Sequence, residues 1–273
     1  MSTFTFKQKT VYYNYQKNQG ETLVVLNGIM MSTQSWEPFM ETWLKDFSVL
    51  RLDFLDQGQS DKMDQAYDQS LQVELLKALL DHLSLNKVHL MGISYGGSIA
   101  LQFAASYQRY LSKLILFNAA AYTTPWLRDV GRGWNEVAQM HNAKAYYHIT
   151  IPYIYSPHFY VKNQAWMKNR EETLLQVFSN PVFLNAMCRL TRSAESHDVR
   201  EALKEIETET LVVASDYDFL TPKSEQIYIV ERMPNATLLT FDNTGHASMY
   251  EKPELFMTTI RGFLKSDVSA IKI

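Results

Sequence analysis

The sequence predicts an α/β protein with a mostly parallel central sheet, flanking helices and one helical insertion. Short apolar runs alternate with amphipathic helical stretches over most of the chain. This alternation is typical of βαβ units, in which a helix carries the chain between two parallel strands. A long middle segment interrupts the alternation and is rich in aromatic residues. Together these observations indicate a sheet-based core that carries an inserted helical part.

The predicted strands are short apolar runs that end in polar or glycine-containing turns. Residues 71–83 instead space their leucines along one face of a helix and place charges on the other face. A second helix begins directly after the strand at 87–91 and continues to about residue 107, and the last helix covers residues 253–265. Strands are expected at residues 23–26, 47–53, 87–91, 113–117, 210–214 and 237–241.

Residues 121–203 are predicted to form the inserted helical cap, and residues 1–120 and 204–273 the core. A structureless loop of that length would be unusual in a compact domain. A cap over the carboxyl ends of parallel strands lies where α/β sheets bind ligands. Most aromatic residues of the cap should pack it onto the core, and a few should line a substrate pocket. We expect Trp126, Tyr153 and Phe159 to line it.

Composition argues against several classes of protein and site. The net charge of −3 disfavours a nucleic-acid partner or an anionic membrane surface, because both bind clustered Lys and Arg. The single cysteine, Cys188, excludes an internal disulfide and a C-x-x-C metal site. No apolar run approaches the roughly 20 residues of a membrane span, and residues 1–9 lack the apolar stretch of a signal peptide. We therefore expect a soluble, cytoplasmic protein.

Ser94 is the candidate nucleophile. Residues 92–96 (GISYG) fit the pattern G-x-S-x-G, which is weak alone but here lies between an apolar strand and a helix. Such a tight turn exposes the serine hydroxyl at a helix N-terminus, where the dipole and free N–H groups favour developing negative charge. The missing G-K-[ST] ending argues against a phosphate-binding turn, and a plain strand–helix corner remains the alternative.

A serine hydroxyl needs a base to act as a nucleophile near neutral pH. Of the 7 histidines, His246 alone follows a predicted strand at the sheet edge where Ser94 emerges. The base in turn needs an acid that accepts the other imidazole N–H. Asp218 follows the strand at 210–214, and Asp216 is its nearest rival. The chain order Ser…Asp…His is the order of α/β-hydrolases.

The combined motifs resemble the α/β-hydrolase superfamily over essentially the whole chain. The resemblance assigns the acid to Asp218, because Asp218 and not Asp216 precedes x-x-[ST]-P in the family's frame. It also implies an oxyanion hole made by the backbone N–H groups of Ile29 and Tyr95. The motifs are the strand ending in Asn27-Gly28, the stretch D-x-x-D-x-G-x-S from Asp53 to Ser60, the serine turn, D-x-x-T-P from Asp218, and Gly245-His246.

The chain departs from the family pattern at two positions. Most relatives have His-Gly where this chain has Asn27-Gly28. We expect Asn27 and Gly28 to support the oxyanion loop. Asn-Gly, with the Gly-Gln-Ser of residues 58–60, is similar to bacterial enzymes of the rhamnolipid-precursor synthase type, which transfer 3-hydroxyacyl chains. Asp56 stands where the family usually has Gly, and the sequence offers no account of it. Ser94 disfavours the dehalogenase and epoxide hydrolase branches, which use Asp as the nucleophile.

The resemblance and the motifs together imply a carboxylesterase-like serine hydrolase. It would cleave a carboxylic ester or thioester of an apolar acyl group through an acyl-enzyme on Ser94. An acyltransferase acting on 3-hydroxyacyl carriers is one alternative, and a ligand receptor with slow or vestigial hydrolase activity is another. No cofactor and no metal are expected, and the expected partner is a small-molecule ester. A homodimer is a possible assembly.

Overall fold

The computed structural model describes residues 2–266 and is built around an eight-stranded sheet. The strand order is β1-β2-β4-β3-β5-β6-β7-β8. β2 pairs antiparallel with β1 and β4, and every other neighbouring pair is parallel. The mostly parallel sheet predicted from the sequence is thus confirmed. The strands are β1 Ser2–Phe6, β2 Lys9–Gln16, β3 Thr22–Leu26, β4 Ser48–Leu52, β5 Val88–Ile93, β6 Leu111–Phe117, β7 Thr210–Ser215 and β8 Ala236–Phe241.

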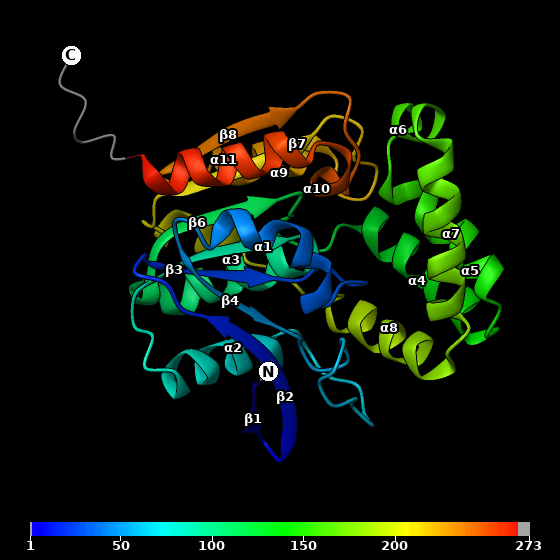
Figure 1. Cartoon of the computed structure of the whole chain (residues 1–273), viewed down its shortest axis with the longest axis horizontal. Coiled ribbons are helices and arrows are strands. Elements are labelled where there is room, and N and C mark those ends of the chain that lie inside the picture. Colours follow the sequence, from blue (N-terminus) through cyan, green and yellow to red (C-terminus); the bar gives the residue numbers. More distant parts are fainter. Residues whose placement is uncertain (1, 267–273) are drawn as a thin grey trace.

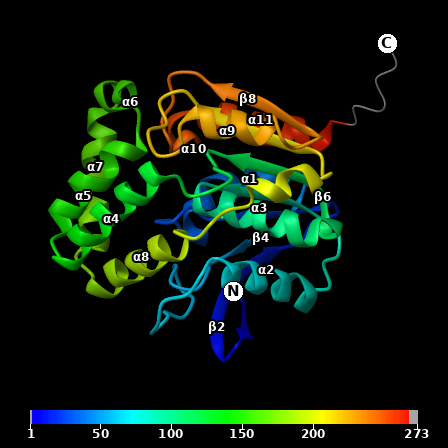
Figure 2. The same ribbon diagram turned by 180° about the vertical axis from the view of Figure 1, so that it is seen from behind.

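Helices cover both faces of the sheet, as Figures 1 and 2 show from opposite sides. α1 and α11 pack on one face with an aromatic cluster that includes Trp36, Trp43 and Phe256. α2, α3 and α9 pack on the other face. β3 and β5 are buried at every position because helices lie on both sides of them, which explains why their sequences are apolar except for Thr22 and His89. These helices are α1 Glu37–Trp43, α2 Ser70–His82, α3 Tyr95–Tyr107, α9 Lys223–Val230 and α11 Pro253–Lys265, and the short α10 Ser248–Glu251 directly precedes α11.

Five further helices lie between β6 and β7 and gather beyond one end of the sheet (Figure 1). Their entry and exit are joined by the bridge between Tyr122 and Asp198 and by the 2.8 Å hydrogen bond from Val199 N to Ala121 O. All five fall within the predicted range 121–203, whereas the division into separate domains stays a prediction. The helices are α4 Pro125–Gln139, α5 Ala143–Ile154, α6 Pro157–Lys162, α7 Gln164–Phe178 and α8 Pro181–Ser193.

The order of the strands fixes where a ligand can bind. From β3 the chain passes through α1 to β4 on one side, and from β5 it passes through α3 to β6 on the other. Neighbouring loops that diverge in this way open a crevice at the carboxyl ends of β3 and β5. The helical insertion lies beyond that same edge. Between residues 2 and 266, none of the helices is long and apolar enough to cross a membrane.

Candidate active site

Ser94 occupies a strained backbone conformation between β5 and α3. Its φ is 54° and its ψ is −118°, a region that non-glycine residues rarely adopt. Such a conformation costs about 1–3 kcal/mol and persists where the surroundings enforce it, most often at functional sites. Here the Ser94 N–H donates to Phe117 O at 3.0 Å, which ties the turn to β6. The turn therefore holds Ser94 directly before the first residue of α3.

The glycines of the turn are required by close backbone contacts. A Cβ atom on Gly92 would lie 2.3 Å from the carbonyl oxygen of Gly96. A Cβ atom on Gly96 would lie 2.6 Å from the carbonyl oxygen of Leu26, at the end of β3. Both distances are shorter than any van der Waals contact, so the G-x-S-x-G pattern lets α3 begin directly against the end of β3.

His246 and Asp218 form a buried pair. His246 Nδ1 lies 2.7 Å from Asp218 Oδ2, and the Asp218 side chain is fully buried. The carboxylate also accepts hydrogen bonds from the N–H groups of Leu220 and Thr221 and from the Thr221 hydroxyl, all at 2.8–2.9 Å. These donors fix the carboxylate, and the carboxylate fixes the imidazole with Nε2 directed away from it. Asp218, and not Asp216, is thus the acid in contact with His246.

The loop that carries His246 is held from several sides. Thr244 N donates to Asp216 Oδ1 at 3.0 Å, and Asn118 Nδ2 donates to His246 O at 2.7 Å. Ala247 N donates to Ile154 O of α5 at 2.9 Å, which joins the loop to the helical insertion. Asp216 is exposed and holds this loop without contacting the imidazole. The imidazole is therefore placed by both the sheet and the insertion.

Asn27 is buried behind the loop after β3 and bonded on both sides of its amide. Its Nδ2 donates to Leu52 O at 2.8 Å and to Gln57 Oε1 at 3.1 Å, and its Oδ1 accepts from Trp36 Nε1 at 2.7 Å. Gln57 Nε2 in turn donates to Gly28 O at 2.9 Å. Asn27 therefore orders the predicted oxyanion loop through Gln57, a residue that the sequence analysis did not select.

The two N–H groups expected to bind an oxyanion are available. Tyr95 N is at the first position of α3, where an α-helix supplies no acceptor. Ile29 N donates to no group among residues 2–266. Both residues line the same cavity as Ser94 and His246. An oxyanion that formed next to Ser94 could therefore accept two backbone hydrogen bonds.

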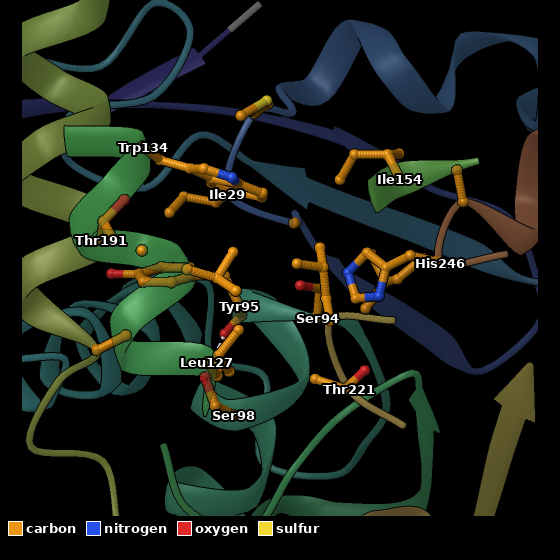
Figure 3. Close-up of a pocket in the computed structure, with 18 of the residues that line it drawn as sticks. Ile29, Ser94, Tyr95, Ser98, Leu127, Trp134, Ile154, Thr191, Thr221 and His246 are labelled. Carbon is orange, nitrogen blue, oxygen red and sulfur yellow. Dashed lines mark hydrogen bonds between the residues drawn. The ribbon is translucent and has the colours of Figure 1, made fainter. Parts of the chain in front are cut away.

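Ser94 and His246 share a cavity of about 170 Å³, and they are neighbours in the view of Figure 3. That volume exceeds a single water molecule severalfold, so a small organic ligand can enter. No hydrogen bond links the Ser94 hydroxyl to His246 among the described residues, and such bonds often tighten only in the substrate complex. The walls contributed by the insertion are mainly apolar and include Leu127, Trp134, Ile151, Ile154 and Leu174.

The predicted pocket residues need correction, because Trp126, Tyr153 and Phe159 do not line this cavity. Trp126 is 53% exposed and donates to Phe219 O at the surface. Phe159 stacks on Tyr155, which does line the cavity, and so lies behind its wall. Tyr153 packs half-buried against the hydrophobic core. Trp134, on the inward face of α4, and Tyr155, directly after the end of α5, are aromatic residues of the insertion that do line the cavity.

Asp56 has an explanation in the structure. Its φ of 72° is the left-handed conformation that glycine adopts most easily, which accounts for the family's Gly at this position. Here the buried carboxylate forms a two-pronged ion pair with Arg189 of α8, with distances of 2.6–3.1 Å. The substitution thus connects the loop after β4 to the helical insertion. Sequence reasoning could not find this pair, since 133 positions separate its members.

Within residues 2–266, no group of three or more His, Cys, Asp or Glu side chains could hold a metal ion. The chemistry that the described site can perform with its own groups is nucleophilic attack by a hydroxyl that a carboxylate-oriented imidazole deprotonates.

Comparison with known proteins agrees with the fold. The family model described as "alpha/beta hydrolase fold" matches residues 21–253. The crystal structure of MGS-M2, an α/β-hydrolase enzyme from a Medee basin deep-sea metagenome library, is 49% identical, with a TM-score of 0.97 over the whole of both chains.

Curated relatives are more distant in sequence. A 3-oxoadipate enol-lactonase of Acinetobacter baylyi is 27% identical over 95% of this chain and 94% of its own. A provisionally named carbamate hydrolase of Pseudomonas syringae pv. syringae is 27% identical over 93% of this chain and 98% of its own. The chain is an enzyme of the α/β-hydrolase family.

Proposed function

We propose that this protein is a serine hydrolase that cleaves a carboxylic ester or thioester through an acyl-enzyme on Ser94. One observation carries the proposal. His246, held by its buried 2.7 Å contact with Asp218, lines the same cavity as the strained Ser94. A carboxylate that holds one imidazole nitrogen leaves the other free to act as a base. The enol-lactonase relative is consistent with this chemistry, because a lactone is a cyclic ester.

The proposed reaction has two halves. His246 Nε2 takes the proton of the Ser94 hydroxyl as Oγ bonds to the carbonyl carbon, and the N–H groups of Ile29 and Tyr95 stabilise the oxyanion. The imidazolium then protonates the departing alcohol or thiol. Its release leaves the acyl group bound to Ser94 as an ester. Water, deprotonated by His246, attacks the acyl-enzyme and releases the acid. Asp218 keeps the imidazole in the required tautomer throughout.

The insertion is proposed to act as a cap that selects the acyl group. Its wall of the cavity is apolar, and apolar burial contributes about 0.8 kcal/mol per methylene. An acyl chain that occupied this wall would gain binding energy with length until the space was filled. We therefore propose a substrate with an apolar acyl or acyl-like portion.

The transferase alternative differs only in the acceptor that attacks the acyl-enzyme. Asn27, which suggested it, is buried and does not line the cavity, so it supports the loop in either reaction. The receptor alternative requires that the acyl-enzyme forms slowly or not at all. One kinetic experiment separates the three possibilities.

That experiment measures p-nitrophenol release from esters graded by acyl length, with and without an added alcohol or 3-hydroxyacyl acceptor. We expect turnover by the wild type and a loss of roughly 10⁴ or more in kcat for Ser94→Ala. An acyl product that shifts from acid to acceptor ester would establish the transferase. Equal rates for the wild type and Ser94→Ala would contradict the hydrolase proposal.

A further inference from the structure

Arg170 is a cation on the apolar face of a helix. Along α7, the buried residues Met167, Leu174 and Phe178 recur at helical spacing, and Arg170 occupies the same stripe. Arg170 and Leu174, one turn apart, both line the cavity that holds Ser94. An arginine on the inward face of a helix is costly unless something compensates its charge.

No acidic side chain of the described chain compensates it. None of the ion pairs formed among residues 2–266 includes Arg170. Its Nε is buried and lacks a hydrogen-bond partner. The guanidinium instead lies over the ring of Tyr250, 5.2 Å from its centroid. A cation–π contact attracts the charge but leaves Nε without an acceptor.

The guanidinium stays charged in this position. Burial works to lower the pKa of Arg170, but the neighbouring oxygens of Tyr155 and Tyr250 outweigh it and raise the pKa above its usual value. For the Tyr155 phenol, burial has the opposite effect: it raises the pKa, which keeps the phenol neutral. The cavity wall therefore carries a permanent positive charge at Arg170, which its tyrosine neighbours do not neutralise; Arg128 and Glu195 also line the cavity.

The position of Arg170 within the cavity follows from its neighbours. Tyr155 directly follows Ile154, whose carbonyl accepts a hydrogen bond from Ala247 N next to His246. Tyr250 lies on α10, directly after the same loop, and both tyrosines line the cavity. Arg170 is thus on the His246 side of the site, in the wall of the chamber where the scissile ester would bind.

We propose that this enzyme selects esters that carry a free carboxylate, which pairs with Arg170 while Ser94 attacks the ester carbonyl. The substrate class is the monoester or lactone of a dicarboxylic acid. A carboxylate matches the paired N–H donors of a guanidinium, and in the cavity it would give Arg170 the anionic partner that the described residues do not supply. The apolar walls would contact the methylene groups between the two ends of the acid. This inference rests on the proposed hydrolase function and adds the chemical class of the substrate.

The test compares two esters that differ only in this charge: p-nitrophenyl hydrogen adipate, and its methyl ester, in which the carboxylate is masked. For the wild type we expect kcat/KM to favour the free acid by on the order of 10- to 100-fold, the usual value of a hydrogen bond to a charged group. Arg170→Met should bring the ratio of the two kcat/KM values close to one. Arg170→Lys should keep part of the preference, because lysine retains the positive charge but lacks the paired N–H donors of the guanidinium.

Lys168→Met is the matched control, because Lys168 is an exposed cation on the same helix. It should leave the ratio unchanged. A wild-type enzyme that hydrolyses the masked ester as well as the free acid would overturn the inference while leaving the hydrolase proposal intact. If the enzyme hydrolysed neither ester and Ser94 did not react with a fluorophosphonate, the hydrolase proposal would be rejected instead.

Binding provides a readout that needs no turnover. Calorimetric titration of adipate into Ser94→Ala protein should show binding that Arg170→Met abolishes in the same background. Equal affinity of the two proteins for adipate would contradict the role of Arg170. p-Nitrophenyl hydrogen adipate, which Ser94→Ala protein should not hydrolyse, should show the same dependence of binding on Arg170, because its carboxylate is the recognised group.

Discussion

Two carboxylates two residues apart have different surroundings. Asp218 is buried and contacts His246, whereas Asp216 is exposed and holds the backbone of Thr244. Asp218→Asn should lower kcat by about 10⁴, because an amide favours the wrong imidazole tautomer. Asp216→Asn keeps an oxygen that can accept from Thr244 N, so its effect on kcat should be much smaller.

The comparison is made by steady-state kinetics on one activated ester with both folded variants. A larger loss for Asp216→Asn than for Asp218→Asn would show that the acid has been placed two residues wrong.

Asn27 should tune the oxyanion loop without taking part in proton transfer, since its amide has no titratable group. Asn27→Ala removes the acceptor for Trp36 Nε1 and the donor to Gln57. We expect kcat to fall by up to about 10²–10³, the effect of a misplaced oxyanion donor. Asn27→His should retain more activity, because an imidazole can still donate once and accept once.

Stability provides the second readout for Asn27. A buried group left without its partner costs about 1–3 kcal/mol, so Asn27→Ala should also lower the free energy of unfolding in urea. Wild-type kcat together with wild-type stability in Asn27→Ala would show that this network does not order the loop.

At the scale of elements, the ion pair of Asp56 and Arg189 connects the core loop to α8. Arg189→Met would leave the fully buried Asp56 carboxylate without its partner, which typically costs about 3–5 kcal/mol. The double variant Asp56→Gly with Arg189→Met should regain much of this stability. Glycine accepts the φ of 72° and leaves no charge to bury.

Urea unfolding checks this prediction, with Arg192→Met as the control because Arg192 is an exposed arginine on the same helix. A double variant no more stable than Arg189→Met alone would contradict the account of Asp56.

The elements that the sequence predicted best are those that bury a continuous apolar surface. The helix at residues 253–265 has the predicted bounds, and each predicted strand lies within two residues of an observed one. β1 and β2 were not predicted, because their alternating and partly exposed residues resemble polar loop sequence. The short α1 was missed for lack of length: seven residues are too few to show a helical period.

The pocket residues were not predictable from aromatic content alone, because only one face of each inserted helix meets the cavity. On α4, Leu127, Gly131 and Trp134 repeat at intervals of four and three and all line the cavity. Trp126 lies one position off this stripe and faces solvent. The period of the helix could have separated Trp134 from Trp126, and the lone cation on the stripe of α7 could have drawn attention to Arg170.

At the scale of the whole molecule, strand topology assembles the candidate site. The carboxyl ends of parallel strands meet at one edge, so turns after β3, β5, β7 and β8 bring Ile29, Ser94, Asp218 and His246 together. The sequence could predict this meeting because the strands themselves were recognisable. The packing of the insertion over that edge depends on long-range contacts, such as Asp56 with Arg189, that no local pattern encodes.

The size of the cavity should limit the length of neutral acyl chains. Activity on neutral p-nitrophenyl esters should rise with each methylene, by up to about 0.8 kcal/mol, until the space is filled. Trp134→Ala removes a buried side chain from the wall and should move the preferred length upward. Trp126→Ala, at the exposed start of the same helix, is the control. A length profile that Trp134→Ala leaves unchanged would show that the acyl chain does not reach this wall.

If Ser94 is a nucleophile activated by His246, it should react covalently with an electrophilic phosphonate. The intact protein is incubated with a fluorophosphonate, digested and mapped by mass spectrometry. We expect a single phosphonylated residue, Ser94, with labelling lost in Ser94→Ala and strongly slowed in folded His246→Ala. A folded wild-type protein that remains unlabelled, or that is labelled at the nearby Ser98 of the same cavity, would contradict it.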